Sequence, residues 1–330
     1  MATPSPVAWA GEVLRCPQCG AVLPPEELNQ LTDPERARGQ ATCRTCGLTL
    51  TSSFGVLLPI APLPEAAEAE LAGIASFDAH TAGIQPGSPH FQQALLTLPD
   101  LPSGELGQEH AYGWKVALGH RGFTQLVTSL GQTPLRVLDI GADWCWSTAR
   151  LARAGHHGVA IDINQDHLRH AAFFFDHGPA FLRVQADMNQ LPFAPEIFDV
   201  VFAVAAVHHT TDLGHTLKEF ARVLRPGGRL VLFREPVRGS QVAEARFGHQ
   251  EKEVGIHETA PTFAQWRAAL DEAGFTWQSN VTQLQFTVAR QTPRLMARNL
   301  KRWLLGVPLL GSAVSPWTIT DRTYRGTKRG

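Results

Sequence analysis

The chain has 330 residues, of which 44% are hydrophobic and 18% charged, as in an ordinary soluble protein. Its formal net charge of −1 excludes a strong overall field that would attract nucleic acid. The sequence contains no run of about 18 or more apolar residues, and its N-terminus lacks a basic region followed by an apolar core. We therefore expect a cytoplasmic protein with one large core and room for a small additional module.

Four of the five cysteines form two C-x-x-C pairs, Cys16 with Cys19 and Cys43 with Cys46, and a glycine follows each pair. Two such pairs supply four thiolates to one tetrahedral ion, and the glycines let backbone amides turn toward the sulfurs. A pair of disulfides is the alternative, which a cytosolic setting disfavours. The pattern predicts a zinc ribbon over residues 1–58. Zn²⁺ would have a structural role there, because four sulfur ligands close the site.

The next segment, residues 59–108, is rich in Pro, Gly and Ala and contains a short acidic helix. This composition predicts a linker and a partly ordered cover segment. Residues 109–130 look helical and aromatic. Within them, Tyr112 and Trp114 are candidates either for lining a ligand site or for core packing.

The rest of the chain is organised around residues 135–163. The mostly apolar run Leu135–Ile140 stops at Gly141, where the chain can turn without interference from a Cβ atom. A helical pattern follows over residues 147–154, and then a second strand ends at Asp162. In a doubly wound α/β sheet, ligands bind outside the carboxyl ends of the strands. Gly141 and Asp162 should therefore face one crevice, in a geometry that suits a nucleoside.

Three more stretches follow this pattern in a fixed order: Ala-Asp-Met at 186–188, FDVVFA at 198–203 and RVLRPGGRLVL at 222–232. Over roughly residues 110–290, this order resembles the class I S-adenosylmethionine-dependent methyltransferases of the methyltransferase type 11 kind. The resemblance implies an α/β fold with a doubly wound, seven-stranded, mostly parallel, Rossmann-like sheet. It also implies a transferase that uses S-adenosyl-L-methionine, preceded in this chain by a zinc ribbon.

The resemblance assigns cofactor contacts by position. Asp162 matches an acid that accepts two hydrogen bonds from the ribose hydroxyls, and Asp187 matches a polar residue that accepts one from the adenine amino group. Carboxylates suit both tasks because they are strong acceptors. A helix N-cap is the alternative role for Asp187. The predicted cofactor-binding residues are Asp139, Gly141, Asp143, Asp162, Ile163, Asp187 and Met188.

The glycine motif departs from the family pattern Asp-x-Gly-x-Gly-x-Gly. This chain has Asp139, Gly141, Asp143 and Cys145 at the four positions, so only the first glycine is kept. Asp143 falls where the backbone of the family comes closest to the methionine part of the cofactor. Its side chain can crowd that approach, or its charge can attract the sulfonium or the amino group. A non-catalytic binding module with a degenerate cofactor site is therefore an alternative to an enzyme.

The predicted fourth strand, Phe198 to Val207, leads into His208 and His209. It lacks the Asn-Pro-Pro-Tyr or Asp-Pro-Pro-Tyr of methyltransferases that act on ring amino groups. A paired histidine at this exit is similar to small-molecule, lipid and quinone methyltransferases. His208 is a candidate catalytic base, because an unperturbed imidazole titrates near neutrality. Its alternative role is to cap the helix that follows.

Two later segments have open roles. The insertion over residues 236–262 contains His257 and Glu258, which are candidates for substrate contact in a lid, with a solvated loop as the alternative. Residues 291–330 hold eight Arg or Lys against one acid and contain an amphipathic helical pattern. This basic C-terminal extension is a candidate for contact with RNA or a membrane surface, or for covering the core.

The predicted organisation is a zinc ribbon at 1–58, a linker and cover at 59–108, the S-adenosylmethionine-binding domain at 109–290 and the basic extension at 291–330. The leading functional hypothesis is methyl transfer to an unidentified small-molecule or lipid-like acceptor. Methylation of ribosomal RNA, through the ribbon and the basic extension, is the alternative enzyme.

Overall fold

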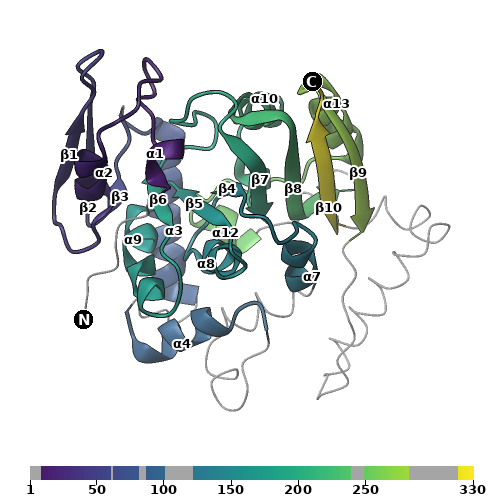
Figure 1. The fold of residues 1–330 in the computed structure, drawn as a ribbon. Coiled ribbons are helices and arrows are strands. Elements are labelled where there is room, and N and C mark those ends of the chain that lie inside the picture. The colour runs from purple at the N-terminus through teal and green to yellow at the C-terminus, as the bar shows by residue number, and fades with distance from the viewer. Residues whose placement is uncertain (1–8, 61, 82–86, 101–121, 239–248, 282–318) are drawn as a thin grey trace.

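Figure 1 shows a computed structural model of the chain. The structure describes residues 9–60, 62–81, 87–100, 122–238, 249–281 and 319–330. Tyr112, Trp114 and the helical pattern of the basic extension lie outside these residues. Among the described helices, none is long and apolar enough to cross a membrane.

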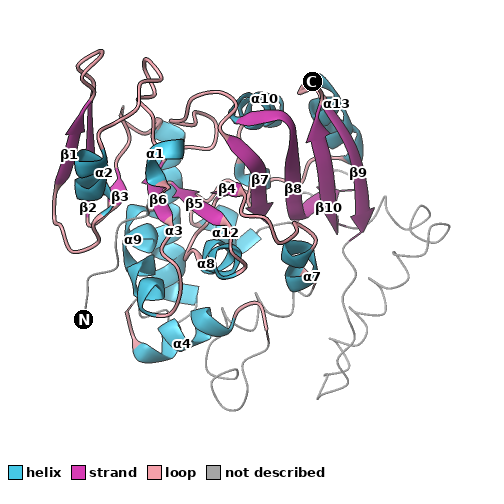
Figure 2. Cartoon of the chain, viewed as in Figure 1, coloured by secondary structure: helices cyan, strands magenta, loops and turns pink. Residues whose placement is uncertain are grey.

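The centre of the molecule is a seven-stranded run of sheet in the order β6-β5-β4-β7-β8-β10-β9 (Figure 2). The five strands from β6 to β8 are parallel, and β10 is antiparallel to both β8 and β9. This is the doubly wound, mostly parallel sheet that the sequence predicts. The bounds are β4 Arg136–Ile140, β5 His157–Asp162, β6 Leu182–Gln185, β7 Phe198–Val204, β8 Leu224–Arg238, β9 Phe275–Val281 and β10 Ile319–Lys328.

Helices cover both faces of the sheet. Successive residues of a strand point to opposite faces, so each strand contributes side chains to two cores. Leu138 of β4 belongs to the core that includes Leu217 and Trp266, whereas its neighbour Val137 belongs to the core that includes Phe123 and Leu151. The first face carries α10 (Leu213–Val223) and α13 (Phe263–Glu272). The second carries α4 (Pro89–Thr97), α7 (Phe123–Thr128), α8 (Trp146–Arg153), α9 (Gln165–His170) and the 3₁₀ turn η1 (Ala171–Asp176).

The cysteine-containing segment is built into the main sheet. It comprises α1 (Ala10–Val13), α2 (Pro25–Thr32), β1 (Gly39–Thr42), β2 (Thr49–Ser53) and β3 (Val56–Leu57), and β3 pairs in parallel with β6. Buried Leu23 and Leu31 belong to the same apolar core as Leu138. Arg183 of β6 is also buried, and its guanidinium donates to the carbonyl of Phe54, in the β2–β3 turn, at 2.9 Å. The segment therefore extends the sheet and the core of the large domain and does not pack as a separate unit.

The end of the chain also belongs to the sheet. Although residues 291–330 are predicted as an extension, β10 fills the position between β8 and β9. Its basic side chains serve the fold: Arg322 stacks over the ring of Phe263 at 4.7 Å, and Lys328 donates to the carbonyl of Leu224 at 2.7 Å. These cations are committed to contacts within the chain, so the charge count of the extension overstates what is available to a partner.

The cover segment contains a 17-residue helix, α3 (Glu65–Thr81), longer than the short helix expected from the sequence. Together with the short helix α12 (His249–Glu253), it borders the cavity at the carboxyl ends of the parallel strands. A 3₁₀ turn, η2 (Val207–His209), lies at the exit of β7 on the same edge of the sheet.

Candidate functional site

A cavity of about 1170 Å³ lies at the carboxyl ends of the parallel strands. Because Ile140 at the end of β4 pairs with Ile161 of β5, Gly141 and Asp162 leave the sheet side by side. Both residues line the cavity, as the sequence predicts from the topology of doubly wound sheets. The cavity is also lined by Asp143, Ile163, Asp187 and Met188, so six of the seven predicted cofactor-binding residues meet in one place.

The turn after β4 has the backbone of a glycine-rich loop, although it holds one glycine. Gly141 has a φ of 60°, and a Cβ there would lie 2.6 Å from the Cβ of Ala206. Asp143 and Cys145, which stand where the family has glycine, also have positive φ values of 49° and 59°. Side chains at such angles cost of order 1–3 kcal/mol each, and this strain is typical of functional sites. The backbone path has therefore been kept while the side chains have changed.

Asp139 has a supporting role beneath the cavity. It is buried, does not line the cavity and accepts hydrogen bonds from the hydroxyls of Ser147 and Thr148, both at 2.6 Å. Burial raises the pKa of Asp139 to about 6, although these two hydrogen bonds act to lower it. Its carboxyl group thus fixes the start of α8 relative to β4 and shapes the turn without facing the ligand space.

Asp162 is held with its carboxylate at the cavity wall. Its Oδ2 accepts from the backbone N–H of Asp143 at 2.8 Å, and its Oδ1 accepts from the N–H of Asn164 at 2.8 Å. Burial, with the nearby carboxylate of Asp143, raises the pKa of Asp162 to about 6. Each carboxylate oxygen has a second lone pair, so Asp162 can still accept two hydroxyl hydrogens.

Asp187 lies on the neighbouring wall, after β6. Its Oδ1 accepts from both the backbone N–H and the side-chain amide of Asn189, at 2.9 and 2.8 Å. No regular helix begins here, so the N-cap alternative is wrong, and the carboxylate closes a local turn at the cavity. Ile163 and Met188 supply apolar surface between the two acids.

Asp143 has a partner that no local sequence pattern indicates. Nδ1 of His167, in α9, donates to Oδ1 of Asp143 at 2.7 Å, and Nε2 donates to Oδ2 of Asp78, in α3, at 2.8 Å. Trp144 stacks on the same imidazole, with ring centroids 3.7 Å apart. Burial alone would lower the pKa of His167, but its hydrogen bonds to Asp143 and Asp78 raise it to about 10. The charged imidazole thus ties the cover helix to the turn after β4.

This tie predicts a pH dependence of stability. Because the folded-state pKa of His167 lies above the ordinary value of 6.5, its stabilisation is complete below about pH 6.5 and is lost as the pH rises through about 10. We expect His167→Gln to lower the free energy of unfolding by about 2 kcal/mol near neutrality, and by progressively less toward pH 10. Urea unfolding of both proteins from pH 6 to pH 10 measures this difference, and a constant difference would exclude a charged His167.

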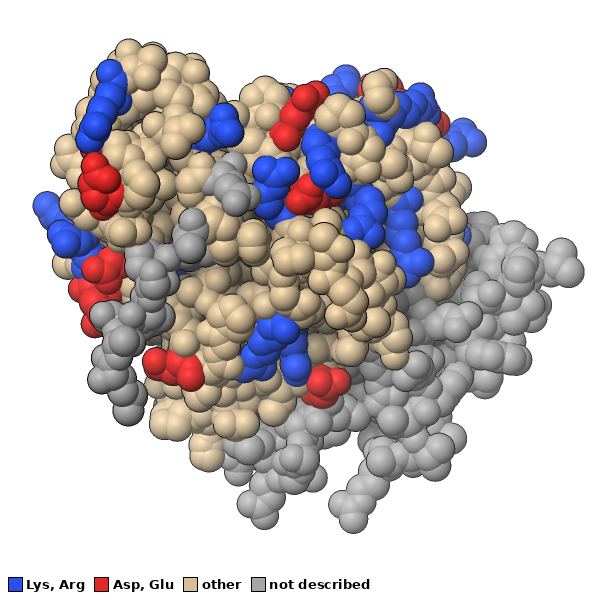
Figure 3. All heavy atoms as spheres, viewed as in Figure 1, with Lys and Arg blue, Asp and Glu red and all other residues tan. Residues whose placement is uncertain are grey.

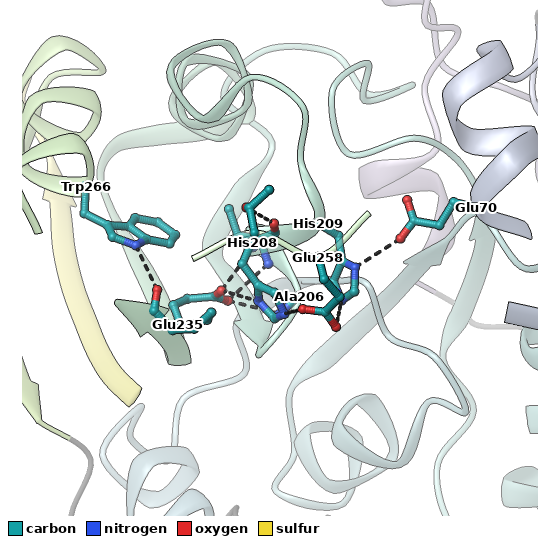
Figure 4. A network of polar contacts seen from close by, with 10 residues as sticks. Glu70, Ala206, His208, His209, Glu235, Glu258 and Trp266 are labelled. Carbon is teal, nitrogen blue, oxygen red and sulfur yellow. Dashed lines mark hydrogen bonds and ion pairs between the residues drawn. The ribbon is translucent and has the colours of Figure 1, made fainter. Parts of the chain in front are cut away.

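The paired histidines at the exit of β7 sit among three carboxylates (Figure 4). Nδ1 of His208 lies 2.9 Å from Oε2 of Glu235, and its Nε2 lies 3.4 Å from Oε2 of Glu258. Nδ1 of His209 lies 3.1 Å from Oε1 of Glu70, in α3, and its Nε2 lies 3.7 Å from Oε1 of Glu258. Glu258 therefore stands between the two imidazoles. Four of these residues, all except Glu235, line the cavity.

This environment argues against the general-base role predicted for His208. Burial alone would lower its pKa, but the hydrogen bonds to Glu235 and Glu258 raise it to about 10. An imidazole that already carries its proton at neutral pH cannot accept another one. The capping alternative for His208 is wrong, because Asp212 caps α10 by accepting from the N–H of His215 at 3.0 Å.

Glu235 is the residue on which this cluster is built, and its side chain is fully buried. Its oxygens accept from the backbone N–H groups of Ala206 and Val207, both at 3.1 Å, and of His208 at 3.2 Å. The sequence offers one signal for it: an acid that lies close after the apolar run of residues 230–233 in β8. Sequence reasoning did not single it out, nor Glu70, Asp78, Trp144 or His167.

We expect Glu235→Ala to lower the free energy of unfolding by about 3–5 kcal/mol, because it leaves a buried imidazolium and three N–H groups without their acceptor. Glu272→Ala is a suitable control, since Glu272 is exposed and pairs with exposed Lys218, and it should cost under about 1 kcal/mol. Urea denaturation measures both. A cost for Glu235→Ala no larger than the control's would contradict the organising role of Glu235.

The four cysteines of the ribbon converge as the sequence predicts. Their sulfurs all lie within 4.8 Å of one another, with Cys16 3.4 Å from Cys46 and Cys19 3.5 Å from Cys43. These separations exceed the roughly 2.05 Å of a disulfide and approach the edge of a tetrahedron of thiolates around one ion.

Comparison with known proteins agrees with the fold. Residues 138–232 match the family model for a methyltransferase domain. The chain is 38% identical over 104 residues to the demethylmenaquinone methyltransferase of Mycobacterium marinum, which covers 31% of this chain and 43% of that protein. It is 32% identical over 166 residues to the 27-O-demethylrifamycin SV methyltransferase of Amycolatopsis mediterranei, which covers 48% of this chain and 61% of that protein. The chain thus spans about half the length of these curated relatives.

Among solved structures, a protein described as a sarcosine dimethylglycine methyltransferase from Galdieria sulphuraria superposes with a TM-score of 0.50. The two chains are 17% identical, and the match covers 72% of this chain and 97% of the other, so the likeness concerns the fold. The strand order, the crevice at the carboxyl ends and the matched domain agree with one another. Residues 138–232 thus form a methyltransferase domain, in a chain that has the Rossmann-like fold of the S-adenosylmethionine-dependent methyltransferases.

Proposed function

We propose that the protein transfers the methyl group of S-adenosylmethionine to a small organic acceptor bound in the same cavity. The observation that carries this proposal is the meeting of six predicted cofactor-binding residues with the histidine exit of β7 in one space of about 1170 Å³. Pockets for a single ligand are typically about 300–1,000 Å³. The cavity is therefore large enough for a cofactor and a second molecule.

The residues present fit the cofactor. Asp162 would accept from the ribose hydroxyls, Asp187 would meet the adenine amino group, and Ile163 and Met188 would contact the adenine faces. The glycine-like backbone at Asp143 and Cys145 supports this assignment, because it leaves the loop free to approach a ligand. When bound, S-adenosylmethionine supplies a methyl group already activated by the sulfonium charge. The protein's work is then to bind and orient both molecules and to exclude water.

Apolar side chains favour an acceptor with a hydrophobic part. Ile74 and Phe77 of α3 line the cavity, and so does Ile256. The named acceptors of the two curated relatives are a demethylated quinone and a rifamycin, which supports a small organic acceptor here as well. Because His208 already carries its proton, the proposed reaction relies on positioning and not on a histidine base.

RNA as the acceptor has less support. Figure 3 shows basic and acidic side chains mixed on one face of the molecule. At the strand edge opposite the cavity, Arg136 and Arg225 both pair with Asp199, at 3.4 and 3.0 Å. Paired cations contribute little to binding phosphates.

The test is titration of the protein with S-adenosylmethionine and with S-adenosylhomocysteine, followed by transfer of labelled methyl groups to pooled hydroxylated and quinone-like compounds and, in parallel, to ribosomal RNA. We expect cofactor binding and labelling of a small organic compound. Labelling of RNA alone would contradict the proposed acceptor class. The absence of cofactor binding would favour the non-catalytic binding module.

We also propose that Cys16, Cys19, Cys43 and Cys46 bind one structural Zn²⁺. The convergence of the four sulfurs supports this assignment. Four sulfur ligands leave no open position, so the ion would hold the ribbon against the main sheet and take no part in methyl transfer.

A further inference from the structure

A second cluster of potential metal ligands lies inside the cavity, about the histidine exit of β7. One ring nitrogen from each of His208 and His209 and one carboxylate oxygen of Glu258 lie within 4.8 Å of one another. Two neighbouring residues of the sequence supply the imidazoles, and a loop some 50 residues later supplies the carboxylate. This cluster contains no cysteine and is separate from the ribbon.

Both imidazoles are oriented in the same way. His208 directs Nδ1 to Glu235 at 2.9 Å, and His209 directs Nδ1 to Glu70 at 3.1 Å, so both Nε2 atoms face Glu258 (Figure 4). Histidines that bind a metal almost always give their other ring N–H to a carboxylate, a carbonyl or water, which fixes the ring and the tautomer. His208 makes this hydrogen bond to Glu235, whereas Nδ1 of His209 lies close to Glu70 without a hydrogen bond.

The distances fit donor atoms around an ion better than direct hydrogen bonds. Nε2 of His208 lies 3.4 Å from Glu258, and Nε2 of His209 lies 3.7 Å from it. Charged N–H···O bonds are normally about 2.7–2.9 Å long. Two donors that are each about 2.1 Å from a tetrahedral ion lie about 3.4 Å apart. The two imidazoles approach different oxygens of Glu258, and each separation is close to an edge of a coordination tetrahedron.

The charge of the cluster also calls for a cation. Three carboxylates, from Glu70, Glu235 and Glu258, surround the two imidazoles, and the exposed fractions of the five side chains lie between 0% and 24%. Carboxylates shielded from water in this way need a compensating positive charge. A divalent ion bound between the imidazoles and Glu258 would supply such a charge.

We propose that His208, His209 and Glu258 bind a divalent transition-metal ion, with Glu235 and Glu70 as the carboxylates that orient the two imidazoles. Two histidines and one carboxylate are a ligand set for zinc and for non-haem metals, and they leave coordination positions open. These positions face the cavity that we assign to the methyl acceptor. If the proposed function holds, an oxygen atom of the acceptor completes the coordination, so the acceptor carries a hydroxyl or carbonyl group.

The test is a zinc titration without S-adenosylmethionine, so that its outcome does not depend on methyl transfer. The protein is purified with the ribbon metal in place, and its metal content is measured by mass spectrometry. Zn²⁺ is then titrated against a chelating indicator. We expect one further equivalent in the wild-type protein. We expect at least tenfold weaker binding of that equivalent in Glu258→Gln and in His209→Gln.

His257→Gln is the matched control, because His257 is an exposed histidine that lines the same cavity beside Glu258 but is not part of the cluster. It should leave the second equivalent unchanged. His209→Gln keeps the test decisive if Glu258→Gln does not fold, since His209 is the most exposed member of the cluster, and retention of the ribbon metal reports folding. Two results would overturn the proposal. One is a wild-type protein that binds no zinc beyond the ribbon's equivalent, and the other is a folded His209→Gln variant that binds the second equivalent as tightly as the wild type.

Discussion

Replacing Cys43 with serine should abolish zinc binding by the ribbon and lower the unfolding temperature of the whole chain, not of the ribbon alone. Structural zinc sites contribute about 10–16 kcal/mol of apparent binding free energy in small peptides. The ribbon's Leu23 and Leu31 share the apolar core of the main domain, and β3 pairs with β6. We therefore expect a loss on the order of 5 kcal/mol, which corresponds to a fall of roughly 10–20 °C.

Metal analysis and thermal unfolding measure the two effects. Cys145→Ser is the matched control, since Cys145 is a buried cysteine outside the four-sulfur cluster. The Cys145→Ser protein should contain as much zinc as the wild type. Retention of zinc by Cys43→Ser would refute the ligand assignment. Two separate unfolding transitions would show that the ribbon is an independent unit, despite the shared core.

Replacing Asp162 with alanine should weaken the binding of S-adenosylmethionine more than a hundredfold. The variant removes two charge-assisted hydrogen bonds to the ribose, together worth on the order of 3–5 kcal/mol. It also removes the acceptor for the N–H of Asp143, which helps to fix the turn after β4. Asp162→Asn keeps the size of the side chain and one acceptor oxygen, so its affinity should lie between those of alanine and wild type.

The same carboxylate predicts a pH dependence of cofactor affinity. Because burial raises the pKa of Asp162 to about 6, the group is an ionised acceptor above about pH 7 and becomes protonated as the pH falls through about 6. Affinity measured by calorimetry should therefore be constant between about pH 7 and 8 and should fall toward pH 5. Asp162→Asn should lack this decline. If Asp162→Ala bound the cofactor as tightly as the wild-type protein does, the ribose assignment would be contradicted.

The sequence by itself determined the local part of the site. An apolar strand, Gly141, a helix and a second strand ending at Asp162 are consecutive in the chain, and their periodicities are set by local geometry. Parallel strands bring their carboxyl ends to one edge, so the meeting of Gly141, Asp162 and Asp187 could be predicted without coordinates. The two C-x-x-C pairs were equally readable, because metal ligation requires a short, fixed spacing.

Only the tertiary structure decided how the charges are paired. His167 contacts both Asp143 and Asp78, and His208 contacts both Glu235 and Glu258, through contacts that span up to 89 residues of sequence. Buried imidazoles take their charge state from the carboxylates that packing brings to them, and no local pattern specifies that choice. For that reason the sequence suggested a base at His208, whereas the fold makes it a cation.

Tertiary structure also decided where the polar strand at the C-terminus belongs. Residues 319–328 read as part of a basic extension, because charged side chains recur along them. In the fold, β10 pairs along both its edges, Tyr324 is fully buried, and Arg322 and Lys328 bind groups within the chain. Backbone hydrogen bonds to two neighbouring strands satisfy a polar sequence that has little apolar periodicity of its own, and those neighbours exist only once the sheet has formed.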